Sequence, residues 1–464
     1  LINFCRSNCI VESLKPREAL FGGRTNALKL HHECASNEKI NYIDYTSLYP
    51  YVQKYGQFPV GHPKIITENF DYTNNYFGLI KCKILPPKQL YIPVLPARIN
   101  NKLVFALCRT CSQEQNQDKC NHNDDERCLE GTWVSLEVYK AIDKGYKLIE
   151  YYEVWHWAEI SQYDKSTKSG GLFTAYINKA MKDKQESSGF PVNCVDDKAK
   201  QIYVQNYYEN EGILLDINKI EKNVGKRQVA KLKANNQWGY LAMNSNKTQY
   251  KAITNPAEWF MMLNNDSFII HNADLSFDKI IQVFYSYNSD LYIGGYKTNV
   301  CLGAFVTAQA RLKLYDELDR LNKRVLYFDT DSIFYVSKPN EYEPKLGEYL
   351  GDFTNEIDIN EGNHIVEFTS AGPKNYAYKL DTGLTHCTVK GFTLNCAASL
   401  KINYDSIKNI VINDHTKKLS VNQLQFKRNK NDWNVETSVV DKIYGFVYDK
   451  RVIQNDLTTL PYGF

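Results

Sequence analysis

Two acidic stretches carry the residues best suited to bind metal ions. Asp329 and Asp331 belong to YFDTDS at residues 327–332, and the apolar residues on both sides predict two short strands that meet at a turn. Side chains alternate along a strand, so the two carboxylates should project to the same side and repel unless a cation bridges them. Mg²⁺ or Mn²⁺ suits such oxygen ligands. The alternative is a solvated Asp-Thr-Asp-Ser turn without a ligand.

A second acidic strand end lies far upstream. Asp44 follows an apolar run and opens the sequence DYTSLYP at residues 44–50. Carboxylates contributed by two distant strands could form a two-metal site for phosphoryl transfer. Between these stretches, KLKANNQWG at residues 231–239 predicts a basic helix that ends at its glycine, in a segment expected to become helical near Asp216.

The order of these three stretches resembles motifs A, B and C of family B DNA polymerases. The matching patterns are D-x-x-S-L-Y-P from Asp44, K-x-x-x-N-x-x-[aromatic]-G from Lys231, and Y-x-D-T-D-S from Tyr327. The region with CRTC at residues 108–111 and YEVWH at 152–156 is further similar to the protein-primed Polinton (Maverick) transposon polymerases. The resemblance implies an α+β fold: a right-hand polymerase with an antiparallel-sheet palm, helical fingers and a small thumb.

The resemblance also implies roles for individual residues. Asp44, Asp331 and the carbonyl of Tyr45 would bind Mg²⁺ (or Mn²⁺), with Asp329 assisting as the third catalytic carboxylate. Tyr49 would exclude a 2′-hydroxyl from the sugar pocket.

The helix of motif B would hold the incoming dNTP. Lys231 would contact the triphosphate and Asn235 the pocket. Arg227 shares their helix face at i, i+4, i+8 spacing, which predicts a further phosphate contact; a solvated charged face is the alternative. Asn236 and Trp238 depart from the Ser and Tyr that are usual in the family.

Three further segments are candidates for DNA binding. Gly23 and Arg24 belong to a Gly-Gly-Arg stretch in which backbone can approach a ligand closely and the guanidinium can pair with phosphate. Lys374 and Tyr376 match the family's K-x-Y motif for the primer end, and Lys390 lies on the basic segment that follows. An ordinary turn or surface charge is the alternative for each.

One cysteine cluster has the spacing of a metal site. C-x₂-C is followed within twenty residues by further Cys and His, and the candidate ligands of a structural Zn²⁺ are Cys108, Cys111, Cys120, His122 and Cys128. Four of the five would complete a tetrahedral shell. Free thiols in a mobile loop are the alternative.

The motifs divide the chain into six expected regions. These are 1–60 (first part of the palm, motif A), 61–165 (an insertion like the first terminal-protein region, TPR1, with the zinc loop at 104–133), 166–242 (fingers, motif B), 243–297 (an insertion like TPR2), 298–398 (second part of the palm, motif C) and 399–464 (thumb). Residues 298–321 predict a long helix that packs beneath the acidic hairpin.

Composition limits the function classes. The chain has 464 residues, enough for several subdomains, and 56 basic against 53 acidic residues, so nucleic-acid binding would depend on local charge. No apolar run approaches the 18 or so residues of a membrane span, and the first residues lack a signal-peptide pattern. We expect a soluble intracellular protein, nuclear if it comes from a eukaryotic mobile element.

The predicted partners are template-primer DNA, dNTPs and, for protein-primed replication of a linear mobile or viral-like element, a terminal protein. With 43 residues before Asp44, no proofreading exonuclease domain is expected in this sequence. Two alternatives stay open: an RNA-templated polymerase, and a decayed or truncated fragment that binds nucleic acid without catalysis.

Overall fold

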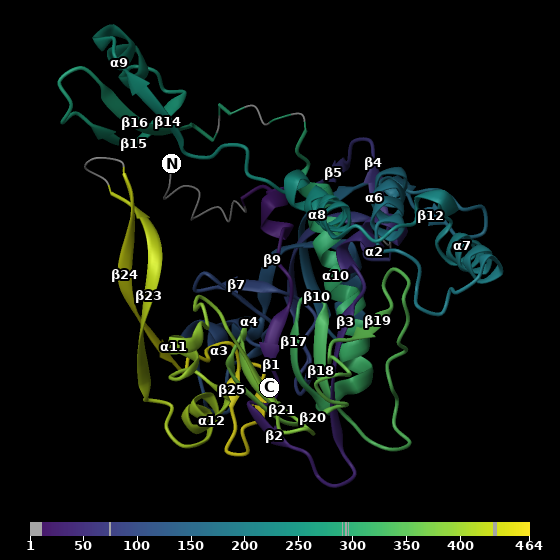
Figure 1. Cartoon of the computed structure of the whole chain (residues 1–464). Coiled ribbons are helices and arrows are strands. Elements are labelled where there is room, and N and C mark those ends of the chain that lie inside the picture. Colours follow the sequence, from purple (N-terminus) through teal and green to yellow (C-terminus); the bar gives the residue numbers. More distant parts are fainter. Residues whose placement is uncertain (1–11, 74–75, 290, 293–294, 296, 430–433) are drawn as a thin grey trace.

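The structure is a computed structural model that describes residues 12–73, 76–289, 291–292, 295, 297–429 and 434–464. Residues 1–11 of the first expected region therefore lie outside the described residues. Figure 1 shows a central body, a helical lobe on one side of it and two projecting strand units on the other.

A nine-stranded sheet forms the centre of the body, with strands from distant parts of the chain. Its main path runs through β1 (Thr25–Ala27), β17 (Val325–Asp329), β18 (Ser332–Ser337), β3 (Lys39–Tyr45), β20 (Ile365–Gly372), β21 (Asn375–Leu380) and β22 (Thr385–Val389). β2 (His31–Glu33) pairs with β20, and β19 (Phe353–Asn355) pairs with β3. Each of these pairings is antiparallel, which confirms the predicted mixture of helices with an antiparallel central sheet.

Strands β17 and β18 form the predicted hairpin, and both faces of β18 are buried. Ile333 and Tyr335 face one apolar core, whereas Phe334 and Val336 face a second core on the other side of the sheet. A strand covered on both faces needs apolar residues at consecutive positions, which explains the unbroken run after the acidic turn.

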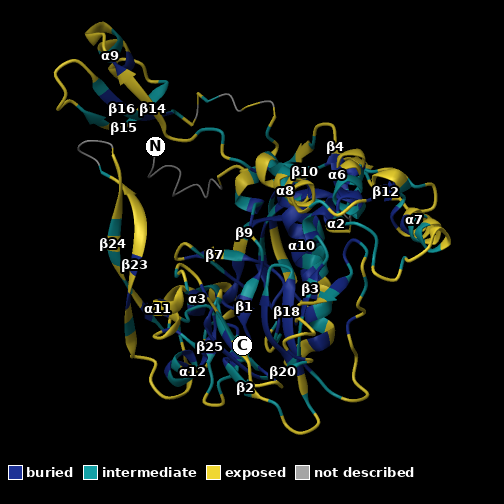
Figure 2. Cartoon of the chain, viewed as in Figure 1, coloured by how far each residue is buried: buried dark blue, intermediate teal, exposed yellow. Residues whose placement is uncertain are grey.

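Helices cover the two faces of the central sheet. The predicted long helix is confirmed as α10 (Val300–Leu321), whose buried side chains include Phe305, Ala308 and Leu318 in the first core. On the other face, α12 (Tyr404–Ile412) contributes Ile407 and Ile410 to the second core. Figure 2 shows the resulting buried centre between these helices and the strands.

A second sheet is built from residues between β3 and the helical lobe. Its strand order is β5 (Lys64–Ile66), β10 (Lys147–His156), β6 (Gly78–Leu85) and β9 (Leu129–Val134). The same region contains β4 (Phe58–Val60), β7 (Ala97–Ile99), β8 (Lys102–Val104), α3 (Arg109–Glu114), α4 (Asp124–Arg127), α5 (Ser135–Asp143) and β11 (Glu159–Ser161).

The helical lobe consists of α2 (Leu48–Tyr55), α6 (Thr174–Glu186), α7 (Asp197–Glu211) and α8 (Val224–Leu241), with β12 (Tyr163–Asp164) and β13 (Ser169–Gly170) at its edge. The predicted bounds of the last helix are corrected. Asp216 caps the short 3₁₀ helix η2 (Ile217–Lys219), whereas Asn223 caps α8 by accepting a hydrogen bond from the Lys226 amide. The helix continues through Gly239 to Leu241, and Gly239 does not adopt the positive φ of a helix-ending glycine.

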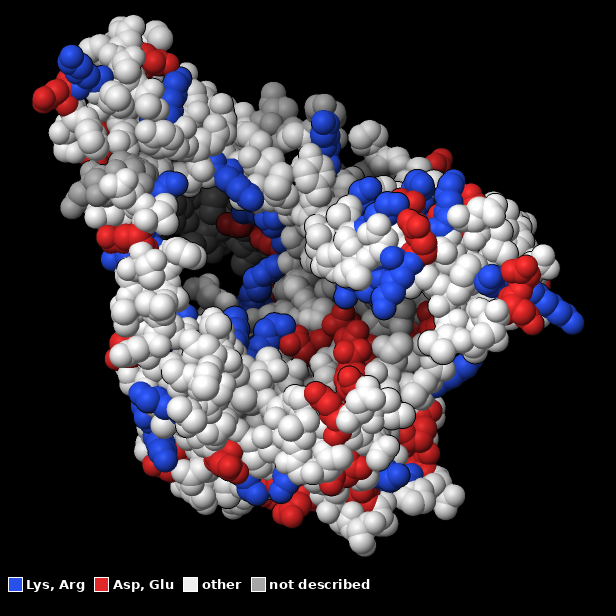
Figure 3. Space-filling view, in the orientation of Figure 1, with Lys and Arg blue, Asp and Glu red and all other residues white. Residues whose placement is uncertain are grey.

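Two strand units project from the body (Figure 1). One contains β14 (Gln249–Ile253), α9 (Pro256–Leu263), β15 (Phe268–Asp274) and β16 (Ile281–Tyr287), and the other is the long hairpin β23 (Lys418–Arg428) and β24 (Val435–Gly445). Figure 3 shows an open hollow between these units and the body, with Lys and Arg side chains on its border.

The last described segment returns to the body through β25 (Val452–Ile453) and β26 (Thr459–Leu460). The Thr459 amide donates to the Leu28 carbonyl at 2.8 Å, next to β1. Shorter elements are η1 (Pro16–Ala19), η3 (Asn322–Arg324) and α11 (Cys396–Ser399). No helix in the described part of the chain combines the length and apolar character that crossing a membrane requires.

Candidate active site

Asp44 and Asp331 meet at the end of the central sheet. Asp44 lies in β3 directly opposite Ser332 of β18, so the neighbouring Asp331 is next to it. The Tyr45 amide donates to the Asp331 carbonyl oxygen at 2.8 Å, which fixes the turn against β3. The two distant acidic stretches therefore converge, as the sequence predicted.

The electrostatics of this cluster favour a cation. Burial, together with the nearby Asp331 and Glu356 carboxylates, raises the pKa of Asp44 to about 8, although Lys231 opposes this shift. Burial, followed by the Asp329 charge, raises the pKa of Asp331 to about 6. Carboxylates crowded in this way ionise fully when positive charge is brought between them, and all are hard oxygen donors. The residues present therefore fit Mg²⁺ or Mn²⁺.

Asp329 is placed differently from Asp331. Its carboxylate receives hydrogen bonds from Lys374 Nζ at 2.9 and 2.8 Å and from the Thr25 hydroxyl at 2.7 Å. Thr330 between the two acids has a left-handed backbone with φ of 63°. The Asp329 charge still contributes to the raised pKa of Asp331, so the two carboxylates interact across this turn.

A pocket of about 690 Å³ joins the acidic cluster to the helical lobe. It is lined by Asp44, Tyr45, Tyr49 and Asp331, by Arg227, Lys231, Asn235 and Trp238 of α8, by Lys184 and Gln185 of α6, and by Ser188, which follows α6. The structure thus brings the predicted face of α8 opposite the carboxylates. Figure 3 shows acidic side chains gathered in the middle of this face of the molecule, with Lys and Arg on either side.

Aromatic packing closes one wall of the pocket. Tyr49, in the first turn of α2, stacks on Trp238 with ring centroids 4.6 Å apart and ring planes at 17°. Burial raises the pKa of Tyr49 to about 12, so its phenol stays neutral.

Several pocket residues were not predicted from the sequence, among them Lys184 and Glu356. Lys184 of α6 donates from Nζ to the Ser47 hydroxyl at 3.2 Å, and burial together with Arg227 and Lys231 lowers its pKa to about 8. Glu356 follows β19 and lies beside Thr354, whose hydroxyl donates to the Asp44 carbonyl at 3.3 Å. For Glu356, the signal available in the sequence was the alternation of Thr354 and Glu356 along one strand edge.

The structure contradicts a DNA-binding role for Arg24. Its side chain is 2% exposed, and the guanidinium lies 4.0 Å from the centroid of the Phe105 ring inside the core. Gly23 instead packs against the acidic turn, since a Cβ at this position would lie 2.6 Å from the Thr330 hydroxyl oxygen. The Thr330 amide donates to the Arg24 carbonyl at 2.8 Å, so this stretch supports the hairpin.

The other predicted DNA contacts lie beside the acidic turn. Lys374 and Lys390 are exposed neighbours, and the Lys390 amide donates to the Lys374 carbonyl at 2.9 Å. Tyr376 is half-buried, with its ring centroid 5.1 Å from that of Tyr327. Of the three, Lys374 contacts Asp329 directly, and Lys390 is its backbone neighbour.

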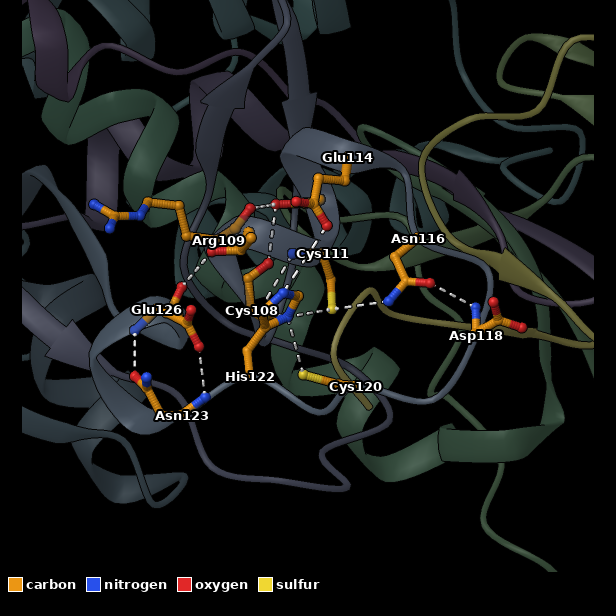
Figure 4. A network of polar contacts seen from close by, with 12 residues as sticks. Cys108, Arg109, Cys111, Glu114, Asn116, Asp118, Cys120, His122, Asn123 and Glu126 are labelled. Carbon is orange, nitrogen blue, oxygen red and sulfur yellow. Dashed lines mark hydrogen bonds and ion pairs between the residues drawn. The ribbon is translucent and has the colours of Figure 1, made fainter.

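Four of the five candidate zinc ligands meet in space. Atoms of Cys108, Cys111, Cys120 and His122 all lie within 4.8 Å of one another, whereas Cys128 is not part of this group. The cluster lies in the region of α3 and α4, apart from the acidic pocket (Figure 4).

Known proteins with related sequence or fold are DNA polymerases. Residues 15–203 match the family model "DNA polymerase type B, organellar and viral". A "Probable DNA polymerase" of Neurospora intermedia is 22% identical over 408 residues, covering 84% of this chain and 33% of that protein.

Solved structures of the phi29 DNA polymerase share the fold. The ternary complex with primer-template DNA and incoming nucleotide aligns with a TM-score of 0.53 at 16% identity, over 93% of this chain and 62% of that one. The complex with single-stranded DNA gives a TM-score of 0.54. The chain thus spans a third of the curated relative and less than two thirds of the phi29 enzyme.

Residues 15–203 thus resemble type B DNA polymerases of the organellar and viral kind, and the fold is similar to that of phi29 DNA polymerase.

Proposed function

We propose that this chain is a DNA-directed DNA polymerase that adds dNTPs to a primer 3′-hydroxyl by two-metal nucleotidyl transfer. The observation that carries the proposal is the convergence of Asp44 and Asp331 opposite the basic face of α8, within one pocket. A triphosphate needs cations on one side and a metal site on the other, and the pocket offers both.

Asp44, Asp331 and the Tyr45 carbonyl would hold Mg²⁺ or Mn²⁺, and Asp329 would assist from the edge. Bound there, divalent cations lower the pKa of the attacking 3′-hydroxyl and neutralise charge on the leaving pyrophosphate. Lys374 donates two hydrogen bonds to Asp329, and this contact would orient the lysine ammonium group towards the primer end.

The side chains of α8 and α6 would bind the nucleotide. Lys231, Arg227 and Lys184 point their charges into the pocket and would neutralise the triphosphate, while Asn235 contacts it from the same helix face. Tyr49 and Trp238 would border the sugar and base. Because the rings are stacked, the Tyr49 side chain has little freedom to move, and it would therefore exclude a 2′-hydroxyl from the sugar position.

In this proposal the central sheet is the palm, the lobe of α6 to α8 the fingers, and the hairpin β23–β24 belongs to the thumb. The region of β5 to β10 and the unit of β14 to β16 would correspond to the two insertions of protein-primed polymerases. A terminal protein as primer, and a Polinton-like mobile element as the genome, complete the proposal. Lys374, Tyr376 and Lys390 would contact the primer-template backbone. A zinc ion at the cysteine cluster would take no part in transfer.

The test is Mg²⁺-dependent primer extension by the purified chain, with Asp331→Asn as the diagnostic variant. We expect loss of nucleotide incorporation with template-primer affinity largely retained, because the substitution removes a metal ligand without adding bulk. Asp143→Asn, an exposed acid at the end of α5, is the matched control. Normal extension by Asp331→Asn would refute the site assignment.

Template choice separates this proposal from its rivals. We expect extension on DNA and dNTP use in preference to NTPs. Extension on an RNA template of equal sequence at equal rate would favour an RNA-templated enzyme. DNA binding without extension, by wild type and variant alike, would identify a fragment that binds without catalysis.

A further inference from the structure

The cysteine cluster beside α3 has the geometry of a closed metal shell. His122 Nδ1 lies 3.5 Å from Cys108 Sγ, 3.2 Å from Cys111 Sγ and 3.7 Å from Cys120 Sγ. A tetrahedral zinc with Zn–S bonds of about 2.3 Å and a Zn–N bond of about 2.0 Å has S···N edges of about 3.5 Å. The three separations thus scatter around the edge length that a bound zinc imposes.

The surroundings of the four ligands are those expected of thiolates and a metal-bound imidazole. The Cys111 amide donates to Cys108 Sγ at 3.4 Å, and Asn116 Nδ2 donates to Cys111 Sγ at 3.7 Å. Glu114 Oε2 lies 3.9 Å from the other ring nitrogen of His122, Nε2 (Figure 4). A carboxylate on that side of the ring favours a proton on Nε2, which leaves Nδ1 free for a metal.

Cys128 is excluded from the shell by the local fold. The chain leaves His122 through Asn123, which forms a capping box with Glu126 and starts α4. Cys128 then ends this helix as its C-cap, with its amide donating to the Asp124 carbonyl at 3.1 Å, and its side chain is buried elsewhere. Three thiolates and one imidazole therefore complete the site, and a fourth thiolate is not needed.

The ligand set indicates a structural role. Catalytic zinc keeps one coordination position for water or substrate, whereas four protein ligands close the shell. Cys108 and Cys111 are 0% and 1% exposed, so their thiols have no access to a substrate. Cys108, Cys111 and Cys120 are all free cysteines, so none of the three thiols is held in a disulfide.

The cluster touches the segment that follows the projecting hairpin. The Leu107 amide donates to the Tyr462 carbonyl at 2.8 Å, and the Ile453 amide donates to Gln117 Oε1 at 3.3 Å. Cys108, Cys111, Val452 and Tyr462 share a small apolar core separate from the two main cores. A core of this size gives little stability by itself, so a metal crosslink is an effective way to hold the loop that supports this segment.

We propose that Cys108, Cys111, Cys120 and His122 bind one structural Zn²⁺, and that this ion anchors residues 452–462 against the region of α3 and α4. The proposal is independent of polymerase activity, because metal content and local stability are measured without DNA or nucleotide. A loss of catalysis alone would not contradict the zinc site.

The first experiment measures zinc in the full chain purified from zinc-supplemented cells. Mass spectrometry of the metal should give about one Zn²⁺ per wild-type chain and close to none for Cys120→Ser or His122→Asn. Cys128→Ser is the matched control and should keep the ion. Wild-type protein without zinc, or equal zinc loss in Cys128→Ser, would overturn the assignment.

A second measurement does not depend on variants that could misfold. Chelator-treated wild type, refilled with Co²⁺, should show the absorption of tetrahedral thiolate-bound cobalt, and Zn²⁺ should abolish it with one equivalent. Hydrogen exchange should be faster for residues 452–462 in the chelated protein and return to the initial rate after Zn²⁺ addition. Exchange unchanged by the chelator would refute the anchoring role, and an octahedral cobalt spectrum would refute the ligand set.

Discussion

Tyr49 and Trp238 stack face to face in one wall of the pocket, with ring centroids 4.6 Å apart, although one belongs to α2 and the other to α8. The contact joins the acidic cluster to the basic helix through two rigid rings. Because each ring restricts the other, the wall they form depends on both residues.

The first prediction concerns the choice of sugar. Tyr49→Ala removes the ring beside the expected 2′ position, so discrimination of dNTP against NTP should fall by about 10-fold or more. Single-nucleotide kinetics, as the ratio of the two kcat/KM values, measures the effect. Trp238→Phe should keep most of the discrimination because an aromatic ring remains, and Tyr72→Ala, at an exposed tyrosine, is the control. Unchanged discrimination in Tyr49→Ala would show that another group excludes the hydroxyl.

The second prediction concerns the contact between Gly23 and the acidic turn. In Gly23→Ala the new methyl group would lie 2.6 Å from the Thr330 hydroxyl oxygen, so the turn that carries Asp331 must move. A displacement near 1 Å at a reacting centre lowers kcat by about 100-fold. Thr330 has a left-handed backbone, so adding Thr330→Gly should remove the clash and recover part of the rate. Gly22→Ala, where a Cβ meets no atom within 4 Å, should retain activity.

The third prediction concerns stability. Arg311 of α10 forms a bidentate pair with Glu137 of α5, both bonds being 2.8 Å, and the two side chains are 3% and 1% exposed. Glu137→Gln leaves a buried guanidinium without its counter-charge and should lower the free energy of unfolding by about 3 kcal/mol. Urea denaturation measures the change. Asp197→Asn, at a largely exposed pair with Lys200, should have little effect. Equal stability of both variants would contradict this role of the pair.

The fourth prediction is a pH dependence of nucleotide binding. Burial, then Arg227 and Lys231, lowers the pKa of Lys184 to about 8, against the opposing influence of Glu211. The lysine is therefore charged below pH 8 and loses its proton as the pH rises through that value. Its contribution to binding a triphosphate is present at pH 7 and lost at pH 9, so KM for dNTP should rise by about 5- to 10-fold between them.

Lys184→Arg provides the control for this pH effect, because a guanidinium stays charged throughout the range. Its KM should change much less between pH 7 and pH 9. The same pH dependence in both proteins would assign the effect to a different group.

The sequence predicted the features that depend on local pattern. An apolar run interrupted by Asp-Thr-Asp identified the hairpin, and the spacing of Arg227, Lys231 and Asn235 identified the face of α8 that lines the pocket. Regular periods in strands and helices are visible without knowledge of tertiary contacts.

Features that depend on tertiary contacts were missed or misjudged. Arg24 has the composition of a surface phosphate contact, yet Phe105, from a distant segment, covers its guanidinium. In the sequence, Lys184 does not differ from the other lysines of α6. Only the fold places Ser47 and α8 beside it. The choice among five zinc ligands likewise required the path of the chain after His122, which the spacing of cysteines does not specify.

The bond from the Thr459 amide to the Leu28 carbonyl has a consequence for the order of assembly during translation. β1, which pairs with the strand of Asp329, leaves the ribosome early, and its partner segment near Thr459 leaves more than a hundred residues after the hairpin. In the nascent chain, the acidic hairpin is therefore present for some seconds before the segment around Thr459 can bond to Leu28.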